Sequence, residues 1–352
     1  MAEPLCGTDV MSVPWHHRPG SAVPLLTSGN KGRLNRASAE GHTGGVTLTQ
    51  LGAFVLVARL GSVKAAASAL DVSEPAVSQA LAALRQHLGD PLIERGPNGM
   101  TPTPGGARLL SIASQMVALG AEAEAAVRAA QGAPEPLRVV ATSTIAEFVT
   151  APLLDAFSRR AGREVDGSSG VAGINEMSAL VAGRLTDLAL GPHLGGDPEL
   201  VSEPVFRARL VVVGGPRSSP ATWLVDPSGA DPDSDTGRLL RRLRVSENRV
   251  RVFPNQTAAW EAAAEGAGVA PAFAHLVAHQ IRRGELSVIP TPATPAEVRW
   301  HATTLGVDRR PPLAGAFRRF LGTPEAMHLM RKPGAGIPPS RFRPPVYVTI
   351  WS

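Results

Sequence analysis

The chain has 352 residues and a formal net charge of +5, and only 18% of its residues are charged. This length allows two or three domains, each with its own core, and the positive balance suits a nucleic-acid partner without requiring one. With Cys6 as its single cysteine, the chain can form neither an intrachain disulfide nor a cysteine-based zinc cluster. No apolar run approaches the roughly 18 residues of a membrane span.

The first 45 residues carry no folding signal. They mix Pro, Gly, Ser and His, and they lack the apolar core of a secretory signal. We therefore expect a cytoplasmic protein in which residues 1–45 are either a disordered basic arm or the product of a misassigned start. The first folded domain is expected to begin at residue 46.

Residues 46–104 are predicted to form a winged helix-turn-helix. A first apolar helix ends at Gly61, and Ser62 can cap a second helix over 63–70, because its hydroxyl accepts an otherwise unpaired backbone N–H. A third helix begins after a tight turn at Ser73. Its core-facing positions are spaced three and four residues apart: Val77, Leu81, Leu84 and Leu88.

The opposite face of the third helix carries small and amide side chains, namely Pro75, Ser78, Gln79, Ala82 and Gln86. Such a face suits the major groove, because glutamine can bond base edges and small residues permit close approach. A strand at 92–95, turn residues at 96–99 and a return strand from Met100 predict the wing hairpin. A three-helix packing unit without a ligand is the alternative.

Many short fragments of this region occur in a characteristic order: Phe54 to Ala58, Gly61-Ser62, Ala65-Ala66, Leu70, Val72-Ser73, Pro75-Ala76, Ser78-Gln79, Leu84, Leu88-Gly89, Pro91-Leu92, Glu94-Arg95, and Thr103-Pro104 with Gly106. In this order the region resembles the LysR-type transcriptional regulators. The resemblance implies a set of DNA-binding residues: Ser62, Ser73, Glu74, Pro75, Ser78, Gln79 and Arg95. Of these, Arg95 would contact phosphate. Glu74 departs from the glutamine common in the family, and a carboxylate accepts from cytosine but repels phosphate.

Residues 105–135 are predicted to be a linker helix and hinge. Thr103 can cap this helix, Pro104 suits its first position, and Gly132 with Pro134 ends it. Apolar residues recur at heptad spacing: Leu109, Ile112, Met116, Leu119, Ala123 and Ala126. A lone helix cannot bury such a stripe. We therefore expect a second copy to pair along its first four members, giving a homodimer or, by resemblance, a homotetramer; a core helix within one domain is the alternative.

Residues 136–322 alternate strands and helices, which predicts a parallel, doubly wound α/β sheet. Leu180 with Gly183, 187–190 and 266–269 resemble the LysR effector-binding domain, whose periplasmic-binding-protein-like fold has two α/β lobes. Extended segments at 210–213 and 298–305 would cross between the lobes. The tail, 323–352, is Pro-rich and basic, and its last apolar alternation, 346–351, predicts a strand that docks on its own domain or on a partner.

Three polar loops are predicted to meet at the cleft between the lobes. They are Ser143-Thr144, Gly191-Pro192-His193 and Asn255-Gln256-Thr257, each at the end of a strand or the start of a helix. Free N–H groups at helix N-termini favour an anion or another polar ligand there. Helix capping alone would also explain the Ser, Thr and Asn residues, and 233–236 is interpreted as a cap and turn with no metal.

No motif for catalysis, a cofactor or a metal site is present in the sequence. The sequence therefore predicts a DNA-binding transcriptional regulator, not an enzyme, that binds double-stranded DNA and is controlled by a small anionic or polar effector. The alternative is a solute-binding or transport-accessory protein in which the N-terminal helices are only a packing module.

Overall fold

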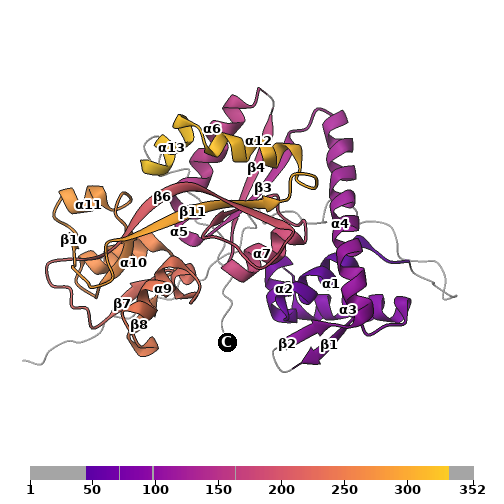
Figure 1. Ribbon diagram of the computed structural model, residues 1–352, viewed down its shortest axis with the longest axis horizontal. Coiled ribbons are helices and arrows are strands. Elements are labelled where there is room, and N and C mark those ends of the chain that lie inside the picture. Colours follow the sequence, from indigo (N-terminus) through magenta and orange to yellow (C-terminus); the bar gives the residue numbers. More distant parts are fainter. Residues whose placement is uncertain (1–44, 71, 97–98, 163, 333–352) are drawn as a thin grey trace, which may run out of the picture.

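The computed structural model describes residues 45–70, 72–96, 99–162 and 164–332. The N-terminal arm and the predicted strand 346–351 lie outside these residues. Three parts follow one another in Figure 1: an N-terminal helical domain, a central lobe (lobe 1) and an outer lobe (lobe 2). Within the described ranges, no helix is both long and apolar enough to cross a membrane.

The N-terminal domain has three helices and a hairpin: α1 (Leu48–Leu60), α2 (Val63–Leu70), α3 (Glu74–Leu88), β1 (Ile93–Gly96) and β2 (Gly99–Pro102). Thr47 caps α1, and Gly61 ends it in the left-handed region at φ 67°. The Met100 N–H donates to the Gly61 carbonyl at 2.9 Å, which ties the wing to this turn. Three of the four predicted core positions of α3 are buried, whereas Leu88 is 42% exposed, because α3 ends there at the Gly89 cap.

The long helix α4 (Pro104–Ala130) begins at the predicted cap, where the Thr103 hydroxyl accepts the Gly106 N–H at 3.0 Å. It ends at Gln131, and Gly132 follows with φ 76°. One face of its first half is buried, through Ala113, Ser114, Val117 and Ala118, and α4 packs against α1. The linker helix is therefore part of the N-terminal domain's core on one side only.

The remaining chain forms one mixed sheet and a small parallel pair. The sheet strands are β3 (Glu135–Ala141), β4 (Val165–Val171), β5 (Leu188–Gly191), β6 (Leu200–Gly214), β9 (Ala270–Phe273), β10 (Ser287–Val288) and β11 (Ala296–Leu305). Their order is β10-β6-β11-β5-β3-β4, and β9 also pairs with β6. The pair is β7 (Trp223–Val225) with β8 (Val250–Val252).

The long strands β6 and β11 join the two lobes. They pair antiparallel from Leu200↔Leu305 to Leu210↔Ala296, with a register shift at Trp300. One end of β11 pairs with β5, next to the parallel strands β3 and β4, and the other end of β6 pairs with β9 and β10. Lobe 1 is thus built on β3, β4 and β5, and lobe 2 on β7, β8 and β9, as the two crossing segments predict (Figure 1).

Helices cover both lobes. They are α5 (Ser143–Ile145), α6 (Ala151–Arg160), α7 (Ile174–Ala182), α8 (Pro227–Ala230), α9 (Asp235–Arg242), α10 (Gln256–Ala264), α11 (Ala278–Arg282), α12 (Pro312–Leu321) and α13 (Pro324–Arg331). A π-helical turn, Ala146–Thr150, connects α5 to α6. A single-turn 3-10 helix, Glu247–Arg249, precedes β8.

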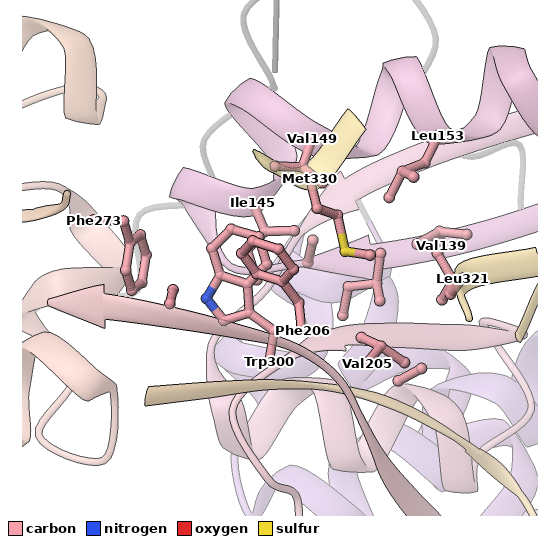
Figure 2. Close-up of a cluster of buried hydrophobic side chains, with 14 of the residues drawn as sticks. Val139, Ile145, Val149, Leu153, Val205, Phe206, Phe273, Trp300, Leu321 and Met330 are labelled. Atoms are coloured by element: carbon pink, nitrogen blue, oxygen red, sulfur yellow. The ribbon is translucent and has the colours of Figure 1, made fainter. Parts of the chain in front are cut away.

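Helix α13 departs from the sequence prediction, which assigned its residues to a Pro-rich tail. Thr323 caps it by accepting the Ala326 N–H at 3.3 Å. Ala326 and Met330 are buried in the main core, so the effector-type domain continues at least to Arg331. Figure 2 shows Met330 within this core, beside Ile145 and Val149.

A second core runs across the boundary between the N-terminal domain and lobe 1. It joins residues of α1, such as Leu51 and Val55, to residues of α7, such as Leu180 and Val181. A Cβ atom on Gly183, at the end of α7, would lie 3.0 Å from Val55 Cγ1, so the two helices meet closely. This contact explains why every residue of α1 from Leu51 to Val57 is buried. We call it the domain junction.

Candidate functional site

The N-terminal half of α3 presents the predicted polar face to solvent. Glu74, Pro75, Ser78 and Gln79 are all exposed. Ser73 is exposed too, but its hydroxyl accepts the Ala76 N–H at 3.4 Å and so caps the helix. This face is free for another molecule, which a helix inside a packing unit would not be.

Two further predicted positions flank this face. The Ser62 hydroxyl accepts the Ala65 N–H at 3.3 Å, so it caps α2 as expected. Arg95 is exposed on β1 of the wing. Arg59, by contrast, turns to the domain junction: it contacts Asp197 at 2.9 Å and Glu199 at 3.6 Å, so its charge is compensated within the chain.

The predicted stripe of α4 lies mostly on its uncovered side. Ile112 is 56% exposed, Met116 41% and Leu119 62%. Leu109 is half-buried and packs against the domain's own core. Three of the four predicted pairing residues therefore form an exposed apolar row, which is costly in water and suits a partner surface.

A cavity of about 30 Å³ lies where the two lobes meet. Its lining comes from six places in the chain: Thr142, Thr144, Ile145, Pro192, Asp226, Ser228, Gly229, Ser234, Asp235, Thr236, Phe273 and Trp300. The loops at 142–145 and at Pro192, which the sequence predicts to meet, do so here. One water molecule needs about 10–15 Å³ of such space, so the cavity has room for two or three water-sized groups.

Hydrogen bonds cross between the lobes beside this cavity. The Ser143 N–H donates to the Ser228 hydroxyl at 2.8 Å, and the two hydroxyls lie 2.6 Å apart. The Thr144 hydroxyl donates to Asp226 at 3.2 Å. Ser143 thus holds the lobes together next to the cavity, and Thr144 reaches into it.

The third predicted loop does not reach the cavity. Asn255 caps α10 by accepting the Ala258 N–H at 2.8 Å. The N–H groups of Gln256 and Thr257 donate to the Glu147 carboxylate at 3.0 and 3.2 Å, and the Thr257 hydroxyl donates to it as well. A carboxylate of lobe 1 therefore already occupies the helix N-terminus that the sequence offered to an anion.

Only part of the second predicted loop reaches the cavity. Gly191 is buried at the end of β5, and Pro192 lines the cavity. His193 is exposed, with its ring centroid 5.3 Å from that of His301. The set of contacts that cross between the lobes (Ser143 to Ser228, Thr144 to Asp226, and Glu147 to Gln256 and Thr257) is called the lobe junction below.

Sequence reasoning missed the acidic and aromatic part of the cavity. Asp226 follows β7 directly, and a strand end is a recognisable signal. Asp235 was interpreted only as part of a cap and turn; Ser234 does cap α9 by accepting the Gly237 N–H at 2.8 Å. Trp300 and Phe273 gave no signal, because aromatic residues on buried strands are usually core.

Burial controls the acid chemistry of this region. Desolvation raises the pKa of Asp226, against hydrogen bonds from the Gly229 N–H and from Thr144 and Ser143 that lower it. Desolvation also raises the pKa of Glu147, and the nearby Asp226 charge adds to that rise. The pKa of Asp235 is raised by burial although Arg238 lies 2.5 Å away. Burial therefore favours the protonated form of all three carboxyl groups.

Two protein-family models match the chain. The model of the bacterial regulatory helix-turn-helix protein, lysR family, matches residues 48–107, and the LysR substrate binding domain matches residues 130–323. The chain therefore belongs to the LysR family. It is a DNA-binding transcriptional regulator with a substrate-binding domain, and the solute-binding alternative is set aside.

Similar proteins are regulators as well. The uncharacterized HTH-type transcriptional regulator Rv0377 of Mycobacterium tuberculosis is 32% identical over 323 residues, covering 87% of this chain and all (100%) of that protein. The regulator CfxR of Cupriavidus necator is 26% identical, over 84% of this chain and 97% of that protein. Among solved structures, ArgP from Mycobacterium tuberculosis shares the fold with a TM-score of 0.51 and 20% identity, over 79% of this chain and 96% of that chain.

Proposed function

We propose that the exposed N-terminal half of α3 reads DNA sequence and that the wing supports it through the phosphate backbone. The exposure of Ser78 and Gln79 carries this proposal, because an amide on a helix face can bond adenine edges in the major groove. Glu74 would disfavour phosphate nearby and accept from cytosine. Arg95, exposed on β1, would add a contact that does not depend on sequence.

The test compares two substitutions in the same domain. Gln79→Ala should cost about 1–3 kcal/mol of binding free energy on the preferred site and relax specificity there. Arg95→Ala should weaken all sequences alike and lower the salt dependence of binding. Fluorescence anisotropy on a panel of single-base variants of the site measures both. Equal specificity profiles for the parent and Gln79→Ala would reject the assignment.

The exposed row on α4 is proposed to pair two copies of the chain, as a homodimer or as part of a homotetramer. Ile112→Asp with Met116→Asp would place like charges across a buried contact, which a dry interface does not tolerate. Light scattering should then show smaller particles, and DNA affinity should fall because two half-sites are no longer held together. Ala107→Asp with Ser111→Asp adds the same charge at the same spacing, on exposed positions away from the stripe, and is the control. An unchanged mass in the first variant would contradict the pairing.

The cavity between the lobes is proposed to bind the effector. A ligand there can change how the DNA-binding domains are arranged only if it binds one arrangement of the protein more tightly than another. Helix α7 offers a physical route, since its N-terminal end contacts lobe 2, where the Ile174 N–H donates to Asp231 at 3.2 Å, and its other end forms the domain junction. We propose that the protein acts as a cytoplasmic regulator and not as an enzyme, because both family models that match it describe a regulator.

A further inference from the structure

The cavity between the lobes has the polarity of a site for a positively charged ligand. Two carboxyl residues, Asp226 and Asp235, are among its lining, and the lining includes no lysine, arginine or histidine among the residues that the structure describes. Asp235 already has a cationic partner in Arg238, at 2.5 Å. Asp226 is left as the carboxyl group that an incoming cation can use.

Asp226 is buried among neutral donors only. It is 2% exposed, and it accepts the Gly229 N–H at 2.6 Å and the Thr144 hydroxyl at 3.2 Å. Within the described ranges, no cationic side chain forms an ion pair with it. A buried carboxylate without a counter-charge is unfavourable. A ligand that brings a positive charge would remove that cost, and an anion would increase it.

A second, independent feature of the cavity wall points to a ligand. Trp300 is 2% exposed, and its indole N–H has no acceptor among the described residues. Figure 2 shows the indole nitrogen on the side of the ring that faces Phe273, which also lines the cavity. A buried N–H usually has a partner, so a bound molecule with an acceptor atom would satisfy it. The Trp300 and Phe273 rings meet edge to face at this wall, with centroids 5.2 Å apart.

The two features together define a chemical class, given that the cavity is the effector site proposed above. We propose that it binds a short amino alcohol, whose ammonium group pairs with the Asp226 carboxylate and whose hydroxyl accepts the Trp300 N–H. Beside the Trp300 N–H, a hydroxyl is a better acceptor than a carboxylate, because a carboxylate would need a cationic partner that the lining lacks. A metal ion suits the site poorly: in the described chain no three His, Cys, Asp or Glu residues gather as ligands. The volume of about 30 Å³ has room for two or three water-sized groups, so the ligand has to be short.

The experiment uses four small probes of similar size on the full-length protein. Ethanolamine carries both features, ethylamine lacks the acceptor, ethylene glycol lacks the charge, and glycolate carries the opposite charge. Thermal unfolding at neutral pH with millimolar probe should give the largest rise in Tm with ethanolamine, a smaller rise with ethylamine, and none with the other two. An equal rise with ethylene glycol or glycolate, or no rise with ethanolamine, would overturn the proposal.

Variants assign the effect to the two groups. Asp226→Asn keeps the helix cap, because asparagine caps as well as aspartate, and it should weaken ethanolamine binding at least tenfold. Asp233→Asn, which changes an exposed carboxyl group on the far side of α8, is the control and should leave binding unchanged. Trp300→Phe keeps an aromatic wall and removes the N–H, so it should reduce ethanolamine binding to the level of ethylamine. Parental binding in Asp226→Asn would reject the ammonium site.

A separate readout distinguishes this inference from the proposed effector role. If ethanolamine raises Tm through Asp226 but leaves DNA binding unchanged in anisotropy, the ligand class stands and the coupling to DNA is rejected. If ethanolamine does not raise Tm and an anionic compound changes DNA binding, the regulator keeps an effector and the ligand class is wrong.

Discussion

The two junctions of this molecule are built from opposite materials. The domain junction between α1 and α7 is an apolar core. Arg59 lies at its edge and donates to the Ala182 carbonyl. Gly183 allows the two helices to approach closely. The lobe junction is made of hydroxyl and carboxyl groups: Ser143 with Ser228, Thr144 with Asp226, and Glu147 with the start of α10. An apolar junction resists opening, because opening would expose its apolar surface to water, which costs free energy.

The polar junction can exchange its partners. When the lobes move apart, water or a ligand can replace each of its hydrogen bonds, so the net free energy of each is only about 0.5–3 kcal/mol. A ligand of modest affinity can therefore change the lobe junction, whereas the domain junction passes such a change on as a rigid contact. Helix α7 touches both, through Ile174 at one end and Gly183 at the other. Four substitutions separate the roles of the two junctions.

The largest effect is expected from the pH dependence of Glu176, near the lobe junction. Burial raises its pKa from the usual 4.5 to about 7, although the Gly173 N–H lowers it by donating to it. The folded state therefore holds this proton more tightly than the unfolded chain. Its stabilising contribution is complete below pH about 4.5 and is lost as the pH rises through about 7. A rise of this size corresponds to about 3 kcal/mol.

Glu176→Gln removes this titration while keeping a neutral group of the same shape. Urea unfolding at a series of pH values between 4.5 and 7.5 should show a fall in the free energy of unfolding for the parent that the variant lacks. Glu122→Gln, at an exposed position of α4, is the matched control and should follow the parent. A parental slope in Glu176→Gln would show that another group carries the pH dependence.

The next effect is expected at Glu147, which crosses the lobe junction. Glu147→Ala leaves the N–H groups of Gln256 and Thr257 without their acceptor. Unpaired buried donors cost about 1–3 kcal/mol each, so we expect a loss of about 2–3 kcal/mol in unfolding free energy. Glu147→Gln keeps one acceptor oxygen and should lose about half as much. Chemical denaturation measures both, and equal losses would mean that packing and not hydrogen bonding holds the lobes here.

The sequence predicted the parts that are encoded locally. The caps at Ser62, Ser73 and Thr103 and the polar face at Gln79 depend on neighbours a few residues away, so spacing alone identifies them. Thr144, singled out because it follows a strand end, lines the cavity, and its role in binding an effector stays a prediction. Asp226 was within reach of the same argument.

The rest depends on contacts between residues far apart in the chain. Gln256 and Glu147 are separated by 109 positions, and no local pattern shows that a helix N-terminus is already occupied. Arg59 is a basic residue of the N-terminal domain, and no local pattern shows that the fold brings Asp197, 138 positions away, to it. The burial of Trp300 is visible as core, yet its unsatisfied N–H is a property of three-dimensional packing.

A smaller effect is expected at Arg59 in the domain junction. Arg59→Ala removes the contacts with Asp197 and with the Ala182 carbonyl, at 2.9 and 3.2 Å. The pair is largely buried, so we expect a loss of about 1–2 kcal/mol in unfolding free energy. Arg207→Ala, in an exposed pair with Glu297, is the control and should change little. If effector binding still changes DNA affinity in Arg59→Ala as in the parent, the ion pair is not part of the coupling.

The smallest change tests the closeness of the domain junction directly. Gly183→Ala adds one methyl group that would lie 2.8 Å from the Ala179 carbonyl oxygen and 3.0 Å from Val55 Cγ1. Because a packed interface must shift to admit it, we expect a loss of about 1 kcal/mol. Gly52→Ala, on α1, adds the same methyl group where nothing lies within 4 Å. It should be neutral or stabilise by up to about 1 kcal/mol through helix propensity. Thermal unfolding of the two variants side by side decides the matter: a shift of the same sign and size in both would mean that α1 and α7 are not in tight contact in solution.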